Sequence, residues 1–124
     1  MRGLIRDVAK ILYGKVDVKT ISDARSLVQE YNIYVAKKLL QEHGLEQSMR
    51  GKTKGYWQEF LKYLLPVEWA VWRKLVKEGK VPKSPDEFYK LVMKEYETND
   101  YFKALKKKME EELNKLIAEV KGTA

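Results

Sequence analysis

The sequence predicts an all-α fold of five to six helices. Apolar residues recur at spacings of three and four along nearly all of the 124 residues, which is the period of an amphipathic helix. Glycine, proline and capping residues fall between these stretches, where helices begin and end. Only residues 15–19 alternate as a strand does, and one five-residue strand cannot form a sheet. We therefore expect a small helical protein with an extended connector at residues 15–19.

The first predicted helix covers about residues 2–13. Gly14 follows it, and a helix C-terminus often needs a residue that accepts the left-handed conformation. Its basic residues lie opposite an apolar stripe, which comprises Leu4, Ile5, Val8, Ile11 and Leu12.

A second, longer helix is predicted at about residues 21–43. Thr20 and Asp23 have the spacing of a capping box, with Asp in place of the usual Glu or Gln, and Gly44 ends the helix. Residues 45–55 contain few apolar groups and two glycines. This composition predicts a loop.

The third helix begins at about Tyr56 and carries apolar residues at steps of 0, 3, 4, 7 and 8 from Trp57. Pro66 interrupts this pattern, and proline disfavours helix in the residue before it. We expect a kink there, or a break followed by a separate helix to about Glu78. Gly79 then ends the helical stretch.

The last two helices have the clearest start signals. Ser84 is placed as an N-cap, a proline follows at the first helical position, and Glu87 completes a capping box. The resulting helix runs to about residue 97. Residues 98–100 then cap a final helix that ends at about Lys121.

The composition excludes several kinds of site. The chain has no cysteine and one histidine, so disulfides, thiolate metal sites, a cysteine nucleophile and a histidine metal cluster are ruled out. We find no nucleophile–base arrangement, and most acids have a Lys or Arg one turn away. The sole histidine, His43, sits near a helix C-terminus, where local capping is common. We expect a non-enzymatic protein without cofactor or metal.

The net charge of +7 favours an anionic partner, either nucleic acid or a membrane surface. The charge is uneven, with 11 Lys and Arg against 6 Asp and Glu in residues 1–55 and 14 against 12 in residues 56–124. All Trp and Phe residues lie in the second part. We therefore predict a basic helical arm at 1–55 and an aromatic-rich bundle at 56–124.

Gly51-Lys52-Thr53 has the ending of a phosphate-binding loop, but the full motif fails. Six residues separate Gly44 from Gly51 instead of four, and the preceding segment is helical rather than a strand. The basic residues of this stretch are better suited to phosphate oxygens of a polymer, or they belong to a solvated connector. They are Arg50, Lys52 and Lys54.

Cations recur every four residues along the first helix, and the excess continues into the second. Such a helix can follow the phosphates of duplex DNA without reading bases, although an ordinary charged surface is the alternative. The candidate nucleic-acid contacts are Arg2, Arg6, Lys10, Lys15, Lys19, Arg25, Lys37 and Lys38. A second basic run comprises Arg73, Lys74, Lys77, Lys80 and Lys83.

The tryptophans could stack on bases, but aromatic residues at helical spacing are more often in a core or a protein interface. We predict that Trp57, Trp69 and Trp72 contribute to a subunit interface, where Trp is enriched.

Basic N-terminal helices followed by an aromatic helical bundle, in a small chain without cysteine, resemble the major coat proteins of filamentous DNA viruses of archaea. In that family the basic helices wrap the DNA and the bundle forms the outer shell. The resemblance implies that the cations of residues 2–13 and 21–43, and of the connector between them, contact DNA. We also expect self-association into a homo- or hetero-oligomer. Many lysines and glutamates, no cysteine and few loop residues suit a hot-living organism.

The leading hypothesis is a structural protein that coats double-stranded DNA through its phosphates, in a virion or in the cytoplasm and without a signal peptide. One alternative is a small DNA-binding regulator encoded by a plasmid or virus. Another is a helical protein-interaction module that binds no nucleic acid.

Overall fold

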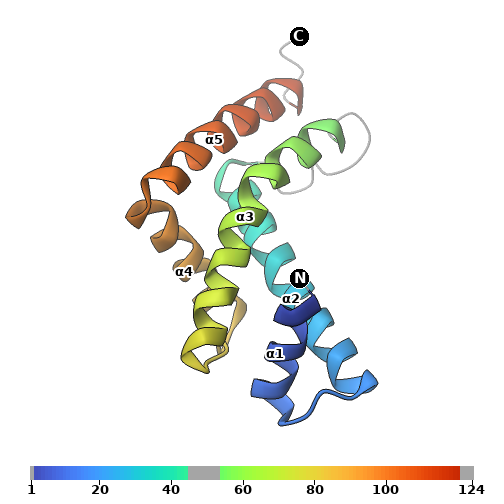
Figure 1. Ribbon diagram of the computed structural model, residues 1–124. Helices are drawn as coiled ribbons and strands as arrows, with labels where there is room; N and C mark the ends of the chain where they lie inside the picture. The colour runs from blue at the N-terminus through green and yellow to red at the C-terminus, as the bar shows by residue number, and fades with distance from the viewer. Residues whose placement is uncertain (1, 45–53, 121–124) are drawn as a thin grey trace.

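The chain folds into a bundle of helices. The computed structural model describes residues 2–44 and 54–120, which form α1 (Arg2–Tyr13), α2 (Val18–Glu42), α3 (Lys54–Glu78), α4 (Pro85–Thr98) and α5 (Asp100–Val120). No strand occurs in these two ranges, and the predicted all-α fold is confirmed. Figure 1 shows α3 running through the middle of the molecule, with α4 and α5 on one side, α1 on the other and α2 behind.

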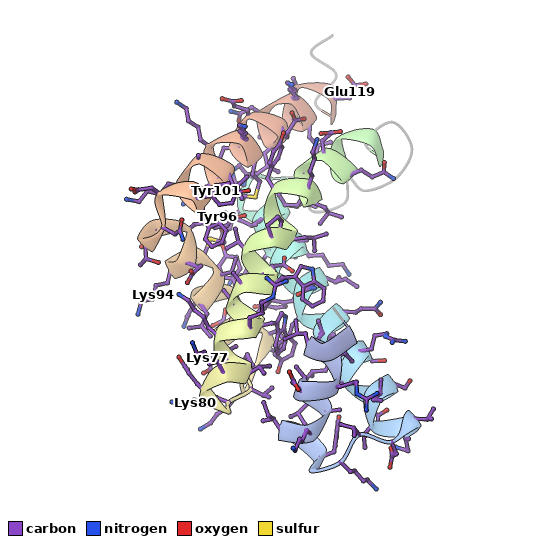
Figure 2. The ribbon with its side chains drawn as sticks, viewed as in Figure 1. Lys77, Lys80, Lys94, Tyr96, Tyr101 and Glu119 are labelled. Atoms are coloured by element: carbon purple, nitrogen blue, oxygen red, sulfur yellow. The ribbon has the colours of Figure 1, made fainter. Side chains whose placement is uncertain are left out.

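The helices are amphipathic, as the sequence pattern predicts. In α1, Leu4 and Val8 are buried, whereas Arg6 and Lys10 are exposed. Leu12, which the predicted stripe included, is exposed at the end of the same helix. Figure 2 shows the same division elsewhere, because lysines of α3 and α4 project outward while the ring of Tyr96 lies between helices.

Two helix ends follow the sequence signals. The hydroxyl of Ser84 accepts a hydrogen bond from the Glu87 N–H at 3.2 Å, which makes Ser84 the N-cap of α4. The Glu87 carboxylate accepts from the Lys83 N–H at 2.8 Å, one residue further back than in a capping box. At the end of α1, Gly14 has φ +73° and donates its N–H to the Lys10 carbonyl at 2.8 Å. Glycine adopts this left-handed conformation at little cost.

The start of α2 differs from the prediction. The helix begins at Val18, inside the segment that was expected to be extended, and its N-cap is Asp17 instead of Thr20. The Asp17 carboxylate accepts the Thr20 N–H at 2.9 Å, and this bond is the main reason that the pKa of Asp17 is lowered. Asp caps a helix at least as well as Thr does, so the earlier start adds helical hydrogen bonds without losing the cap.

Pro66 does not divide α3. The helix is continuous from Lys54 to Glu78, so the predicted fourth helix is the second half of α3. Pro66 is exposed, whereas Leu64 and Val67 on either side of it are fully buried. Both halves therefore bury apolar side chains in one core, and this tertiary packing outweighs the local preference of proline.

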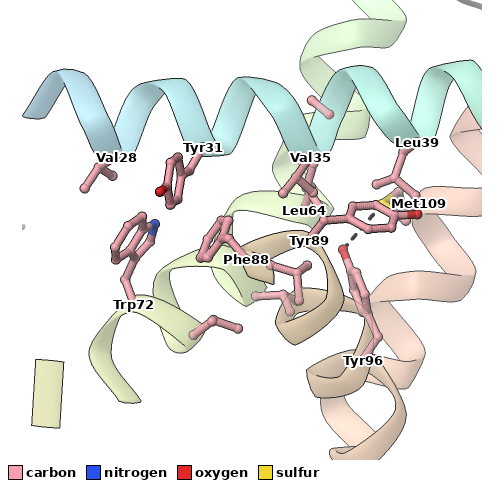
Figure 3. Close-up of a cluster of buried hydrophobic side chains, with 14 of the residues drawn as sticks. Val28, Tyr31, Val35, Leu39, Leu64, Trp72, Phe88, Tyr89, Tyr96 and Met109 are labelled. Carbon is pink, nitrogen blue, oxygen red and sulfur yellow. Dashed lines mark hydrogen bonds between the residues drawn. The ribbon is translucent and has the colours of Figure 1, made fainter. Parts of the chain in front are cut away.

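Aromatic side chains from three helices meet at the centre of the molecule (Figure 3). The Trp72 ring of α3 lies 5.7 Å from the Tyr31 ring of α2 and 4.8 Å from the Phe88 ring of α4, measured between centroids. The Trp72 indole N–H donates to the Asn32 side-chain oxygen at 3.3 Å. Trp72 has no exposed surface, so its predicted place in a subunit interface is wrong. Its apolar surface is used to hold α2, α3 and α4 together.

The buried side chains on both sides of residue 55 belong to one cluster. It extends from Leu4 in α1 through Val35 in α2 to Leu116 in α5. The proposed division into an arm and a bundle stays a prediction, and the described part of the arm shares its core with the bundle.

Candidate nucleic-acid interface

Four of the predicted phosphate contacts are free at the surface. Arg6 and Lys10 of α1 and Arg25 and Lys37 of α2 are exposed, and none of them has an ion pair within residues 2–44 and 54–120. Arg6 and Lys10 are one helical turn apart and therefore share a face of α1. These cations are available to an anionic partner.

Lys15 and Lys19 are paired with nearby acids, but loosely. The Lys15 ammonium lies 3.4 Å from the Asp17 carboxylate, and the Lys19 ammonium lies 3.1 Å from that of Asp23. Both lysine side chains are more than 60% exposed. Exposed pairs of this kind contribute little, so a phosphate can compete for either lysine.

Lys38 has a different role. Its ammonium lies 2.6 Å from the Asp86 carboxylate and 4.6 Å from the centroid of the Tyr89 ring. The hydrogen bond with Lys38 lowers the pKa of Asp86, and the same bond raises the pKa of Lys38. We assign Lys38 to the contact between α2 and α4, where it forms an ion pair with Asp86.

A groove between α1 and α3 has two basic residues on its α3 side. Its volume is about 350 Å³, and Arg73 and Lys77 lie on its α3 side. The α1 side is formed by Gly3, Leu4 and Asp7. Arg73 and Lys77 are exposed and have no ion pair among the described residues, although Asp7 lines the same groove. The cations of α3 thus lie beside α1, the helix that also carries Arg6 and Lys10.

The basic run of α3 continues past the helix end. Lys80 and Lys83 are exposed in the link to α4 and have no ion pair in the described ranges. Figure 2 shows Lys77 and Lys80 at the C-terminal end of α3, at the end of the view where α1 also lies. Lys74 of the same run is occupied, because its ammonium lies 2.7 Å from the Glu95 carboxylate. The sequence identified this run but not its position beside α1.

Several predicted site residues cannot be placed. Arg50 and Lys52 lie outside the described residues, so the role of the basic loop stays a prediction. Arg2 and Lys54 begin α1 and α3, but their side chains are not described, and neither is that of Trp57.

Trp69 and four charged residues of α5 complete the description of the surface. Trp69 is half-buried and packs against the core, which leaves part of its surface for a partner. On α5, Asp100 pairs with Lys103 at 3.6 Å, and Glu112 pairs with Lys115 at 3.3 Å. The mixed charges of α5 therefore compensate one another locally, unlike those beside the α1–α3 groove.

The interior contains one carboxyl group that the sequence reasoning missed. Glu68 of α3 is fully buried, and neither carboxylate oxygen has a hydrogen-bond partner. This burial raises the pKa of Glu68 to about 9. The sequence did indicate that Glu68 is buried, because it lies on the apolar stripe formed by Phe60, Leu64 and Trp72 at four-residue intervals. The closed surroundings give no substrate access to this group.

The remaining polar groups of the two described ranges make local contacts. His43 Nδ1 donates to the Leu39 carbonyl at 2.8 Å, which is a local helix-end contact. No cluster of three or more potential metal ligands occurs in the described ranges. Within the same ranges, no helix is both long and apolar enough to cross a bilayer.

Comparisons with protein-family models, with curated proteins and with solved structures found no match to this chain.

Proposed function

We propose that this protein is a non-enzymatic structural protein that coats double-stranded DNA through phosphate contacts and self-association, as a virion coat protein does. The observation that carries the proposal is the α1–α3 groove, where Arg73 and Lys77 lie beside the helix that presents Arg6 and Lys10. Exposed cations on two packed helices suit a polymer that carries a charge about every 1.7 Å.

The proposed mechanism is neutralisation of phosphates without base recognition. The cations are spread along a helix and a helix end rather than gathered on one recognition helix. Affinity would come from release of counterions, and regular spacing along the DNA would come from protein–protein contacts. This arrangement favours coating over a regulator that binds one site.

The test is fluorescence anisotropy with linear duplex DNA over a salt series, for the wild type and the double variant Arg73→Ala/Lys77→Ala. Loss of two phosphate contacts should reduce the slope of log affinity against log salt by about 1.8. The matched control is Lys107→Ala/Lys108→Ala, which removes the same charge from α5. It should retain most of the slope, because α5 lies away from the groove.

Three outcomes would count against the proposal. If the salt slope falls equally in Arg73→Ala/Lys77→Ala and in Lys107→Ala/Lys108→Ala, DNA is attracted by the net charge of the protein and not by a defined surface. A footprint at one sequence would favour the regulator. Absence of binding at 100 mM salt would leave the protein-interaction module as the better hypothesis. Electron microscopy of the same mixture should show regular filaments if the protein coats DNA.

A further inference from the structure

Exposed hydrophobic side chains are concentrated at the turn between α1 and α2. Four of the six large hydrophobic residues that are exposed in the described part of the chain lie within seven residues. We call these four residues the apolar tip. They are Leu12 at 38% exposure, Tyr13 at 43%, Val16 at 38% and Val18 at 87%. In Figure 1 this turn lies at the opposite end of the molecule from α5.

The apolar tip is held in place by hydrogen bonds. The Thr20 hydroxyl lies 3.2 Å from the Lys15 carbonyl and 3.1 Å from the Asp17 carbonyl, and the Asp17 carboxylate caps α2. Thr20 itself is buried, and Gly14 closes α1 with φ +73°. The turn is therefore defined on both sides. The exposure of its valines follows from a fixed backbone rather than from a frayed helix end.

Lysines surround the apolar tip. They are Lys10, Lys15 and Lys19, and their acid partners are Asp17 and Asp23, which leaves a local charge of +1. The side chains of Lys15 and Lys19 are 67% and 85% exposed. Lysine can lay its aliphatic stem along apolar surface while its ammonium remains in a polar layer. The charge around the tip thus complements an anionic surface.

We propose that the apolar tip inserts into the interfacial layer of an anionic lipid membrane. Val16 and Val18 would enter the boundary between headgroups and acyl chains, and Tyr13 would lie at headgroup level, where tyrosine is enriched. The lysines would contact lipid phosphates, since basic residues near an anionic leaflet are attracted to it. A few apolar side chains combined with basic ones give reversible attachment to a surface.

Two other occupants fit less well. A stable protein interface uses about 20–30 residues a side, whereas the apolar tip is a turn with four apolar side chains. Duplex DNA would satisfy the lysines but would leave the valines and Tyr13 without apolar contacts. Lys10, Lys15 and Lys19 are shared with the predicted DNA contacts, but the four apolar residues of the tip are not. The membrane proposal therefore does not depend on DNA binding.

The experiment measures pelleting of the full chain with vesicles of phosphatidylcholine alone or mixed with phosphatidylglycerol. The wild type should pellet only with the anionic vesicles. Val16→Ser/Val18→Ser should lower the partition coefficient about tenfold or more, because two apolar side chains no longer enter the lipid. The matched control, Ile33→Ser/Tyr101→Ser, removes two exposed hydrophobic residues away from the tip and should bind as the wild type does. Circular dichroism melts of both variants serve as the check that they fold.

The proposal is overturned if the wild type does not pellet, or if the tip variant pellets as well as the wild type, since charge alone would then explain the attachment. It is also overturned if the tip variant converts a lipid-free oligomer into a monomer on size-exclusion chromatography, because a second copy would then cover the tip. DNA anisotropy of the tip variant should be unchanged. That control separates a failure here from a failure of the DNA proposal.

Discussion

The charged residues beside the α1–α3 groove and the carboxyl group in the interior have opposite environments. Beside the α1–α3 groove, Arg73 and Lys77 are exposed to water and form no ion pair with a described residue, although Asp7 lines the same groove. In the interior, Glu68 is enclosed so completely that its charged form is suppressed. The comparison teaches that stability and the proposed binding depend on separate sets of residues.

A second buried glutamate sharpens this contrast. Glu95 is almost fully buried on α4, but Lys74 reaches it from solvent and places an ammonium 2.7 Å from its carboxylate. No such cation reaches Glu68 from the described residues, and burial alone raises its pKa to about 9. Burial thus favours the neutral form of Glu68 at pH 7.

The largest expected effect comes from the aromatic centre of the interior. Trp72→Ala should destabilise the protein by about 3–5 kcal/mol, because it leaves a cavity between Tyr31 and Phe88 and an unpaired Asn32 side chain. Urea unfolding followed by circular dichroism measures this loss. A loss below about 1 kcal/mol would show that Trp72 does not hold the three helices together. Trp69→Ala, at a half-buried position on the same helix, is the control and should cost less.

The next effect has the opposite sign. Glu68→Gln should stabilise the protein at pH 7 by about 3 kcal/mol, since keeping a carboxyl protonated 2.5 units above its ordinary pKa of 4.5 costs about 1.4 kcal/mol per unit. The folded state binds one more proton than the unfolded state between pH 4.5 and about 9. Wild-type stability should therefore fall as pH rises through this window.

Unfolding free energies measured at several pH values from 5 to 9 test the assignment. The part of the decline that belongs to Glu68 should disappear in Glu68→Gln. Parallel pH profiles for the wild type and the variant would show that Glu68 ionises normally in the folded protein. Glu97→Gln, an exposed position on α4, should leave the profile unchanged.

Most of the fold could be predicted from the sequence because its signals are local. Ser84 and Gly14 act through neighbouring backbone groups, so the ends they define were placed correctly. The start of α2 was misplaced because Asp17 and Thr20 both suit a cap, and only the folded turn selects between them. The break considered at Pro66 is absent because long-range burial of its neighbours outweighs its local preference, and the alternative of a kink stays a prediction.

The candidate site was less predictable because it depends on which helices become neighbours. The run at Arg73 was visible in the sequence, but nothing local indicates that it lies beside α1. Lys38 illustrates the reverse case, since its partner Asp86 is 48 residues away and removes it from the set of free cations. Pairings of this kind arise only from tertiary structure.

The smallest expected effect on stability belongs to the basic side. Arg73→Ala/Lys77→Ala should change the free energy of unfolding by less than about 0.5 kcal/mol, because both side chains are exposed and make no ion pair with a described residue. Urea unfolding in low and high salt measures this change. A substantial loss of stability would mean that Arg73 or Lys77 supports the packing of α1 on α3, and weakened DNA binding by this variant would then have a structural cause. Unchanged stability together with a smaller salt slope of DNA binding would assign Arg73 and Lys77 to DNA contact. The residues that stabilise the fold would then be distinct from those that bind DNA.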